Sequence, residues 1–395
     1  MSRFLRSSIA FLLTLLLLLP GRSDSCCAGQ QRAITEYHVA QGNALSFAPP
    51  FAVSASDAAS TSPALAALHG TVHVAWEESS RIYHRVLEDG QWSAVRRAAW
   101  GEQPALALDA NGVAHLVFVN EFGGNFEVYH SRWVGSWTLP RNVSNTTGIS
   151  SSPAVSVAPN GTVHVVWADN TPGYSVIYHA YWNGAYWINE PIPNAFGGAP
   201  TLAADDGWLH VAWQDRDVVE GPYEVYYCRL NDVGWSLPED LSDSPDEASI
   251  IPSLAVGPGG WAHVAWQERS GGYYRIRYTQ GAVGYWSMPE QISESALDAY
   301  LPCLATRDNN QLYVGWDNGL SAQYCSRHIS ESLWSPRREV RRDPMGVTDL
   351  NLAVDSLGRL HAVWAELTAA NDWEVLYQEL SYRALLPLNV KGRLG

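Results

Sequence analysis

Acidic side chains recur in this chain a few residues after an aromatic residue that ends a short apolar run. Three arginines, Arg81, Arg216 and Arg269, stand in or beside the same segments. Carboxylate and guanidinium groups gathered at one opening can bind sugar hydroxyls, and several carboxylates together can hold Ca²⁺. We therefore predict a ligand-binding site made of these arginines and of seven acidic residues, Glu77, Glu121, Asp169, Asp215, Glu268, Asp317 and Glu366.

A structural role is the alternative for these carboxylates. A carboxylate just past a strand accepts hydrogen bonds from the N–H groups of a turn, and its repetition favours such a role over catalysis. The segment from Asp215 to Tyr223 departs furthest from the pattern of the other segments. No catalytic residue can be assigned, and apart from the Ca²⁺ alternative we predict no metal and no cofactor.

The elements that must position these residues are copies of one unit. A strand of the type His-Val-Ala-Trp, first seen at residues 73–76, occurs seven times at intervals of 42 to 53 residues. Around it each copy has a first strand that proline usually leads, a glycine turn, an acidic loop, a third strand and, in six copies, a tryptophan that begins a fourth strand. A repeat of this length is typical of β-propeller blades, and no helical period competes with it.

The repeat predicts an all-β protein, a seven-bladed β-propeller of four-stranded antiparallel blades over residues 42–383. The seventh copy ends after its third strand, residues 374–380, and a segment similar to the missing fourth strand lies before the first copy, at residues 45–54. We expect this N-terminal strand to complete the last blade and close the ring, because closure removes exposed sheet edges.

The tryptophan and histidine columns are predicted to pack between blades. Twelve of the 18 tryptophans fall at two equivalent positions of the repeat, which is typical of buried rings between sheets. Six histidines share one column and would spread around a ring, whereas a metal site needs three or four that converge. The other six tryptophans are candidates for exposed platforms on which a sugar could stack: Trp100, Trp133, Trp182, Trp208, Trp261 and Trp373.

The two ends of the chain lie outside the repeat. Residues 1–28 combine early arginines with an apolar stretch and predict a secretory signal peptide, so we expect a secreted or periplasmic protein. A lipoprotein anchored through Cys26 is the less favoured alternative. Residues 29–41 are assigned to a linker and residues 384–395 to a short tail, which is too brief to span a bilayer.

Composition excludes some partners. A net charge of −15 argues against nucleic acid, because phosphate binding needs clustered lysine and arginine. Cys228, Cys303 and Cys325 form an odd set without paired spacing, so we predict buried free thiols rather than a disulfide framework. We expect a monomer whose partner is a glycan or a cell-surface ligand.

One turn carries a resemblance to a known family. The segment Asp89-Gly90-Gln91-Trp92-Ser93 resembles the end of the Asp-box, Ser-x-Asp-x-Gly-x-x-Trp, of sialidase-like β-propellers with BNR repeats. Residues 231–236 and 284–287 are weaker echoes, and no copy contains the whole box. Sialidases of this fold are expected to use three arginines, a Tyr–Glu pair, an Asp acid and a Phe/Tyr-Arg-Ile-Pro motif, whose nearest match, at residues 274–277, lacks the proline.

The Gly-x-x-His-Val stretches also look similar to ulvan-lyase-like propellers, which are expected to use a His or Tyr base and an arginine. The repeat, the acidic loops and these resemblances are compatible with three functions. The preferred one is a non-catalytic propeller that binds glycans or another surface ligand through its acidic loops. The alternatives are a glycan-cleaving enzyme, either a glycoside hydrolase or a polysaccharide lyase, and an architectural module of the cell envelope.

Overall fold

Short strands account for all the regular structure in the described part of the chain. The computed structural model describes residues 49–216, 221–244, 247–257, 259–294, 296–306 and 310–380, and these ranges contain thirty strands and no helix. The all-β expectation is therefore confirmed. All of these residues belong to the compact unit that begins at Ser46. The predicted signal peptide (1–28), linker (29–41) and tail (384–395) lie outside the described residues.

Five antiparallel sheets each hold one copy of the repeat. The first contains β2 (Ser60–Leu68), β3 (Thr71–Glu78), β4 (Arg81–Glu88) and β5 (Gln91–Trp92), with β6 (Arg96–Trp100) also on β4. The second contains β7 (Glu102–Leu108), β8 (Ala114–Phe122), β9 (Asn125–Arg132) and β10 (Arg141–Asn142). The third contains β11 (Ser150–Val157), β12 (Val163–Asp169), β13 (Val176–Trp182) and β14 (Trp187–Phe196). The fourth contains β15 (Gly198–Ala204), β16 (Leu209–Asp215), β17 (Glu224–Asn231), β18 (Gly234–Trp235) and β19 (Glu239–Asp240). The fifth contains β20 (Ser249–Val256), β21 (Ala262–Ser270), β22 (Tyr273–Ala282), β23 (Tyr285–Trp286) and β24 (Glu290–Gln291).

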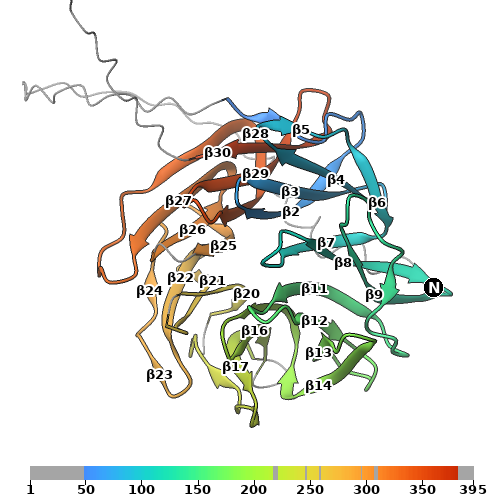
Figure 1. Cartoon of the computed structure of the whole chain (residues 1–395). Helices are drawn as coiled ribbons and strands as arrows, with labels where there is room; N and C mark the ends of the chain where they lie inside the picture. Colours follow the sequence, from blue (N-terminus) through green and yellow to red (C-terminus); the bar gives the residue numbers. More distant parts are fainter. Residues whose placement is uncertain are drawn as a thin grey trace, which may run out of the picture. The chain divides into compact units, whose positions relative to one another are not determined.

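A sixth sheet of seven strands holds the last two copies. Its strands are β25 (Tyr300–Thr306), β26 (Gln311–Asp317), β27 (Gly319–His328), β28 (Arg338–Val354), β29 (Leu360–Leu367), β30 (Trp373–Glu379) and β1 (Phe51–Ala52). The long β28 pairs with β27 through its first half and with β29 through its second half. Strand β1 pairs antiparallel with β30, with Phe51 opposite Tyr377. Figure 1 shows the sheets following one another in chain order around a common centre.

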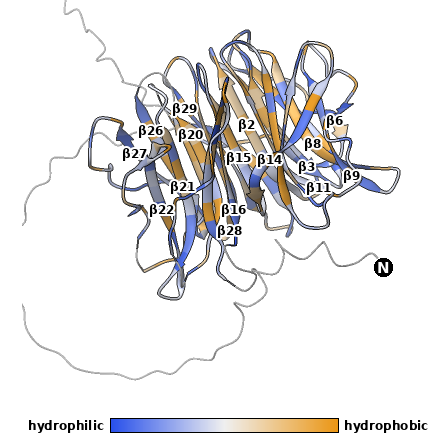
Figure 2. Cartoon of the chain, turned by 90° about the horizontal axis from the view of Figure 1, so that it is seen from below, coloured by the Kyte–Doolittle hydropathy of each residue, from blue (hydrophilic) through white to orange (hydrophobic). Residues whose placement is uncertain are grey.

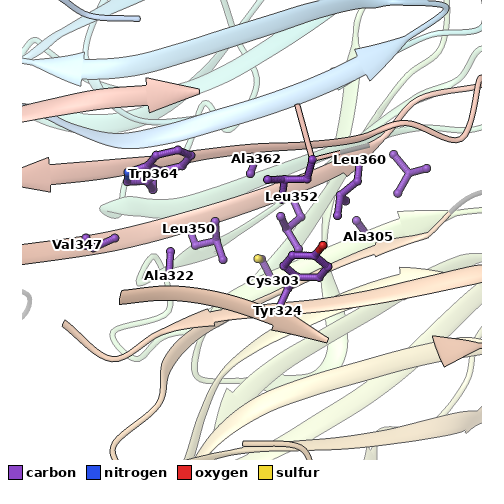
Figure 3. Packing of buried hydrophobic residues seen from close by; sticks show 12 residues of the cluster. Cys303, Ala305, Ala322, Tyr324, Val347, Leu350, Leu352, Leu360, Ala362 and Trp364 are labelled. Carbon is purple, nitrogen blue, oxygen red and sulfur yellow. The ribbon is translucent and has the colours of Figure 1, made fainter. Parts of the chain in front are cut away.

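The two halves of the seven-stranded sheet face each other across a hydrophobic cluster. Cys303 and Tyr324 come from one half, and Leu352 and Trp364 come from the other (Figure 3). A side chain at Gly315 would meet Leu352 at 2.8 Å, so the two copies approach closely at this glycine. The sheet therefore folds back on itself into two packed layers.

Second strands are buried on both faces where their sheets pack against neighbouring sheets. The burial of β3 runs unbroken over Val72 to Trp76 instead of alternating, as expected of a strand without a solvent-exposed face. Figure 2 shows orange, hydrophobic stretches along the strands of neighbouring sheets. The predicted burial of the second-strand tryptophans is confirmed for all six: Trp76, Trp167, Trp213, Trp266, Trp316 and Trp364.

The second tryptophan column contacts the preceding sheet. Five indoles pack against an imidazole or phenol ring of the preceding third strand, and a sixth, Trp92, packs against Tyr377 of the last copy, with ring centroids about 5 Å apart in each pair. These pairs are His84–Trp137, His130–Trp187, His179–Trp235, Tyr227–Trp286, Tyr278–Trp334 and Tyr377–Trp92. Edge-on aromatic contacts of this kind add to the gain from burial and set the spacing between sheets.

Candidate ligand-binding site

The second-to-third loops and the connections between sheets lie on one face, which we call the loop face. Backbone hydrogen bonds join the two kinds of segment at several junctions, for example from Gly101 N–H to the carbonyl of Ser80 at 3.0 Å. The same contact joins Gly197 to the carbonyl of Ser175 at 2.9 Å. The predicted site residues lie at the ends of the second strands or just after them, so they are all near this face.

Asp169 is one of the predicted acidic residues, and its partners are local. Its carboxylate accepts hydrogen bonds from the hydroxyls of Thr146 (2.7 Å) and Ser150 (2.8 Å), from Thr171 N–H (2.8 Å) and from the indole of Trp167 (3.3 Å). Burial by itself would raise the pKa of Asp169, but these hydrogen bonds outweigh burial and lower it. Asp169 therefore holds its turn together, as the structural alternative predicts.

Glu268 and Glu366 each form an ion pair with an arginine. Glu268 Oε1 lies 2.7 Å from Arg277 Nε, and Glu366 accepts two hydrogen bonds from Arg341, at 2.7 and 2.8 Å. Each carboxylate also accepts the indole N–H of the tryptophan two residues earlier. Such bidentate and charge-assisted contacts leave few oxygen lone pairs for a ligand. The partners are third- and fourth-strand arginines that the sequence did not single out, and not the predicted Arg269.

A backbone bulge interrupts the first strand of every copy near the loop face. Each bulge has one residue with φ between 49° and 57°, an unusual conformation for residues other than glycine. These residues are Ser62, Gln103, Ser152, Ala199, Ile251, Leu301 and Asp349, and all but the last precede a proline.

The N–H of the bulge residue is turned away from its own sheet and binds a side chain of the preceding copy. Gln267 Oε1 accepts it from Leu301 at 3.1 Å, and Gln214 Oε1 accepts it from Ile251 at 2.8 Å. Four bulge N–H groups make this hydrogen bond, to the acceptors Glu77, Gln103, Gln214 and Gln267. The N–H groups of Asp349 and Ser62 act in the same way on the carboxylates of Asp317 and Asp349, and they oppose the rise in the pKa of these two carboxylates. Two predicted site residues, Glu77 and Asp317, are therefore junction residues.

The buried carboxylate of Asp317 lies close to that of the half-buried Asp349 at one of these junctions. Asp317 is 1% exposed, accepts Gly319 N–H at 3.2 Å through Oδ1, and has no partner for Oδ2 among the described residues. Burial and the nearby Asp349 carboxylate raise the pKa of Asp317 well above its usual range. Burial also raises the pKa of Asp349, although the N–H of Ser62 opposes this.

Asp215 and Arg216 are the predicted residues that line a cleft between two sheets. The cleft has a volume of about 420 Å³ and opens on the loop face between the third and fourth sheets. Its walls carry three aromatic rings, from Tyr174, Phe196 and Tyr223. Residues 217–220 of the predicted variable segment lie outside the described residues, but both ends of that segment contribute to the cleft.

The cleft places aromatic faces beside charged groups. Tyr174 is 57% exposed and Phe196 43% exposed, and their ring centroids are 5.8 Å apart. The guanidinium carbon of Arg216 lies 4.2 Å from the ring centroid of Tyr223. The backbone N–H of Arg216 donates to Asp215 Oδ1 at 2.7 Å. The arrangement offers apolar rings together with an acceptor and a donor, which is the combination that binds sugars.

Gly197 shapes the base of this cleft. Its φ is +102°, and a Cβ added there would lie 2.0 Å from the carbonyl oxygen of Gln214. Only glycine allows so close an approach of the connection to the neighbouring second strand.

Arg81 belongs to a second exposed group on the first sheet. Its guanidinium carbon lies 4.5 Å from the ring centroid of Trp100, and that of Arg97 lies 4.8 Å from the same ring. Trp100 is 51% exposed, as predicted for this tryptophan. Trp261 is the other exposed member of the six predicted platforms, and Glu121 and Arg269 are exposed near the ends of strands β8 and β21.

The column histidines are arranged in buried pairs. His115 and His130 lie 3.0 Å apart between ring nitrogens, and His210 donates to or accepts from the Tyr227 hydroxyl at 2.7 Å. Burial lowers the pKa of His164 to about 4 and, with nearby His115 and arginine charges, that of His130 to about 3. No group of three or more histidine, cysteine or acidic residues is arranged to hold a metal within the described ranges.

Three site residues escaped prediction from the sequence, namely Tyr174, Phe196 and Tyr223. They lie on two different sheets, and only the close approach at Gly197 brings them together. Their signal in the sequence was weak, because aromatic residues are frequent throughout the chain. The variable loop that ends at Tyr223 was the one correct indication.

Comparison with known proteins shows the fold. No family model and no curated protein matches the sequence. Among solved structures, a PL25 ulvan lyase bound to -[GlcA(1-4)Rha3S]- has a TM-score of 0.59 and 13% identity, covering 81% of this chain and 94% of that chain. The polysaccharide lyase Uly1 has a TM-score of 0.56 and 12% identity, covering 86% of this chain and 92% of that chain. A lectin from Aleuria aurantia with a six-bladed β-propeller fold has a TM-score of 0.47 and 15% identity, covering 72% of this chain and 95% of that chain.

The two lyases show that this chain shares their fold. Together with the repeated four-stranded sheets, the likeness identifies the architecture as a β-propeller. No helix long and apolar enough to cross a bilayer occurs among the described residues.

Proposed function

We propose that this protein is a glycan-binding β-propeller that recognises its ligand in the cleft between the third and fourth sheets. The observation that carries the proposal is the gathering of Tyr174, Phe196 and Tyr223 around Asp215 and Arg216. Sugars present apolar C–H faces and a rim of hydroxyls, so they bind where aromatic rings stand beside fixed donors and acceptors.

Each side chain has a distinct role in this proposal. The exposed faces of Tyr174 and Phe196 stack on sugar rings, since both are accessible on the loop face. Arg216, held against Tyr223, donates to hydroxyl or acidic oxygens of the glycan. The carboxylate of Asp215 accepts hydrogen bonds from sugar hydroxyls.

We also propose that the unit, over residues 42–383, is a closed ring of seven blades. Pairing of β1 with β30 supports closure, as does Arg85, which donates to the carbonyl of Val53 at 3.1 Å and lies 5.1 Å from the ring of Phe51. Val53 and the last-copy residue Val375 share a hydrophobic cluster with Val74 of the first sheet. The seven-stranded sheet supplies two blades, joined through β28.

Cleavage of a glycan is the alternative function, and the fold shared with the two polysaccharide lyases favours it. Proton abstraction by a lyase needs a base close to the sugar. The described lining of the cleft contains no histidine, but it contains Tyr174, Tyr223 and Arg216, which are residue types that such a lyase is expected to use. We favour binding without catalysis because the exposed rings of Tyr174 and Phe196 form a stacking surface, and assay of released products decides between the two functions.

Export and a monomeric state remain proposals drawn from the sequence. Expression with the first 28 residues intact, followed by intact mass of the mature chain, tests cleavage of the proposed signal peptide. Light scattering of the purified chain tests the oligomeric state.

The cleft is tested by a glycan array followed by calorimetry on the purified chain. We expect binding to a polysaccharide or oligosaccharide, with affinity falling about tenfold or more in Tyr174→Ala and Arg216→Ala, as loss of one good contact predicts. Tyr186→Ala is the matched control, because Tyr186 is also exposed, at 63%, but lies in a third-to-fourth turn on the other face.

Absence of any glycan binding would refute the proposal, and so would equal losses in Tyr174→Ala and Tyr186→Ala. Release of reducing sugar or unsaturated uronate that Asp215→Ala abolishes would instead establish the cleaving alternative.

A further inference from the structure

Two arginines share one exposed indole on the first sheet, far along the chain from the cleft. Arg81 on β4 stands directly opposite Trp100 on β6, and Arg97 stands opposite Tyr83. A register irregularity between these pairs brings Arg97 and Trp100, three residues apart, to the same side of the sheet. Both guanidinium carbons consequently lie within 5 Å of the Trp100 ring centroid.

The backbone around this group is held firmly. Gly101, which follows Trp100, donates its N–H to the carbonyl of Ser80, the residue before Arg81, at 3.0 Å. A side chain on Gly101 would lie 2.3 Å from the carbonyl oxygen of Val119, so the segment packs closely on the next sheet. The two strands that carry the arginines are therefore fixed relative to each other.

Arg81 and Arg97 lack the carboxylate partners that several other arginines of the described ranges have. Arg277, Arg327, Arg341 and Arg359 all have carboxylate partners within 4 Å. No ion pair or side-chain hydrogen bond of Arg81 or Arg97 occurs within the described ranges, although the chain carries a net charge of −15. Two like charges held against one ring repel each other, and an anion between or beside them relieves the repulsion.

We propose that Arg81, Arg97 and Trp100 form a binding site for an oxyanion, a sulfate or carboxylate group that is either free or carried on a polymer. The guanidinium fork matches two oxygens of such a group, and stacking on the indole orients each fork before the ligand arrives. The site is separate from the cleft, because its residues come from the first sheet rather than the third and fourth.

Calorimetric titration of the full chain with dextran sulfate, and with uncharged dextran, tests this site. We expect binding of dextran sulfate only, with the dissociation constant about tenfold higher in Arg81→Ala and in Arg97→Ala and a weaker salt dependence in both. Arg97→Lys keeps the charge but not the fork, and we expect it to recover only part of the affinity.

Arg132→Ala removes an arginine of β9 that is exposed like Arg97 and serves as the control. We expect at most a twofold effect from it. Loss of affinity in Arg132→Ala equal to that in Arg81→Ala would overturn the proposal, since it would show diffuse attraction. Failure of the wild-type chain to bind dextran sulfate would overturn it as well.

Sodium sulfate is tested as a competitor of dextran sulfate, with sodium chloride at equal ionic strength as the reference. This comparison distinguishes a site for a free oxyanion from a site for an oxyanion carried on a polymer. Competition supports a site for the free ion, whereas its absence, with polymer binding intact, supports a site for a polymer-borne group. Tyr186→Ala, in an exposed turn outside both sites, should leave dextran sulfate binding unchanged.

Discussion

The phenol ring of Tyr377 meets the indole of Trp92 nearly edge-on, with ring centroids 5.1 Å apart. Tyr377 belongs to the last copy of the repeat and Trp92 to the first. The same contact joins five pairs of successive sheets elsewhere in the chain, for example Tyr227 and Trp286 at 4.7 Å. The first and last copies therefore meet through the interaction that joins neighbouring copies, which supports the proposed closed ring.

Replacement of Trp92 by alanine tests this junction. We expect Trp92→Ala to lower the free energy of unfolding by about 3 kcal/mol, because a large, partly buried ring is lost between two sheets. Trp286→Ala is the control at an internal junction and should cost a similar amount. Denaturant unfolding followed by fluorescence provides the measurement, and a loss in Trp286→Ala alone would argue against closure.

Gln267 tests the side chains that accept the bulge N–H groups. In Gln267→Met the shape is nearly kept but the N–H of Leu301 loses its acceptor, so we expect a cost of about 1–3 kcal/mol. The exposed Gln91→Met should change stability by less than about 0.5 kcal/mol. Equal, small effects of the two changes in urea unfolding would show that the bulge contact contributes nothing.

Asp317 gives a prediction for the alkaline side. Its folded pKa is raised, so its contribution to stability is fully present below the unfolded pKa near 4 and is lost as pH rises through the folded pKa. Gln214 and Gln267 fill the same position with a neutral amide, so Asp317→Gln should retain the contact with the Asp349 N–H. We expect the variant to gain about 1–3 kcal/mol over the wild type at pH 7 but little at pH 4.

Unfolding curves at the two pH values check this prediction. A stability difference between Asp317→Gln and the wild type that does not depend on pH would contradict it.

The histidine pairs give a prediction for the acid side. Burial and nearby His164 lower the pKa of His179 to about 3, so the fold favours the neutral ring. The stabilisation that the neutral His179 ring contributes is fully present above about pH 6.5. It is lost as the pH falls toward the pKa of His179 in the folded state. His179→Tyr should create the His–Tyr pair already present at His210 and Tyr227, and should therefore resist acid better than the wild type.

Thermal unfolding at pH 7 and at pH 4.5 is the measurement for His179→Tyr. We expect similar midpoints at pH 7 and a higher midpoint for the variant at pH 4.5. His69→Asn, in an exposed turn, is the control and should behave as the wild type at both values. A variant that loses as much stability as the wild type on acidification would refute the assignment.

Gly197 tests the cleft without removing any group that contacts the glycan in our proposal. Gly197→Ala places a methyl group 2.0 Å from the carbonyl of Gln214 and should separate the cleft walls, lowering glycan affinity about tenfold or more. Gly184→Ala has a similar positive φ, +98°, but open space around it, and should leave binding unchanged. Calorimetry measures the affinity of each variant for the glycan found on the array. Unaltered affinity in Gly197→Ala would contradict the proposal that the close approach at Gly197 shapes the binding cleft.

The roles of the acidic column show where prediction from the sequence stopped. The spacing of Asp169, Glu268 and Glu366 after tryptophan located all three correctly near the loop face. Their partners come from strands and connections elsewhere in the copy, as with Arg341 for Glu366, and sequence spacing does not specify such pairs. Most of the predicted site therefore proved to be scaffold, and only Asp215 and Arg216 line the cleft.

The strands themselves were determined locally. Alternation of short apolar runs with glycine turns, such as His69-Gly70 with both φ values positive, defines each hairpin within a few residues of the chain. Because every copy repeats these signals, the sequence alone was sufficient for an all-β architecture of repeated antiparallel sheets, although not for the seven-stranded sheet that joins the last two copies. The tertiary structure alone decided which side chains meet across sheets, because the contacts that bring Tyr174 to Tyr223, and Arg81 and Arg97 to Trp100, depend on packing and register rather than on distance along the chain.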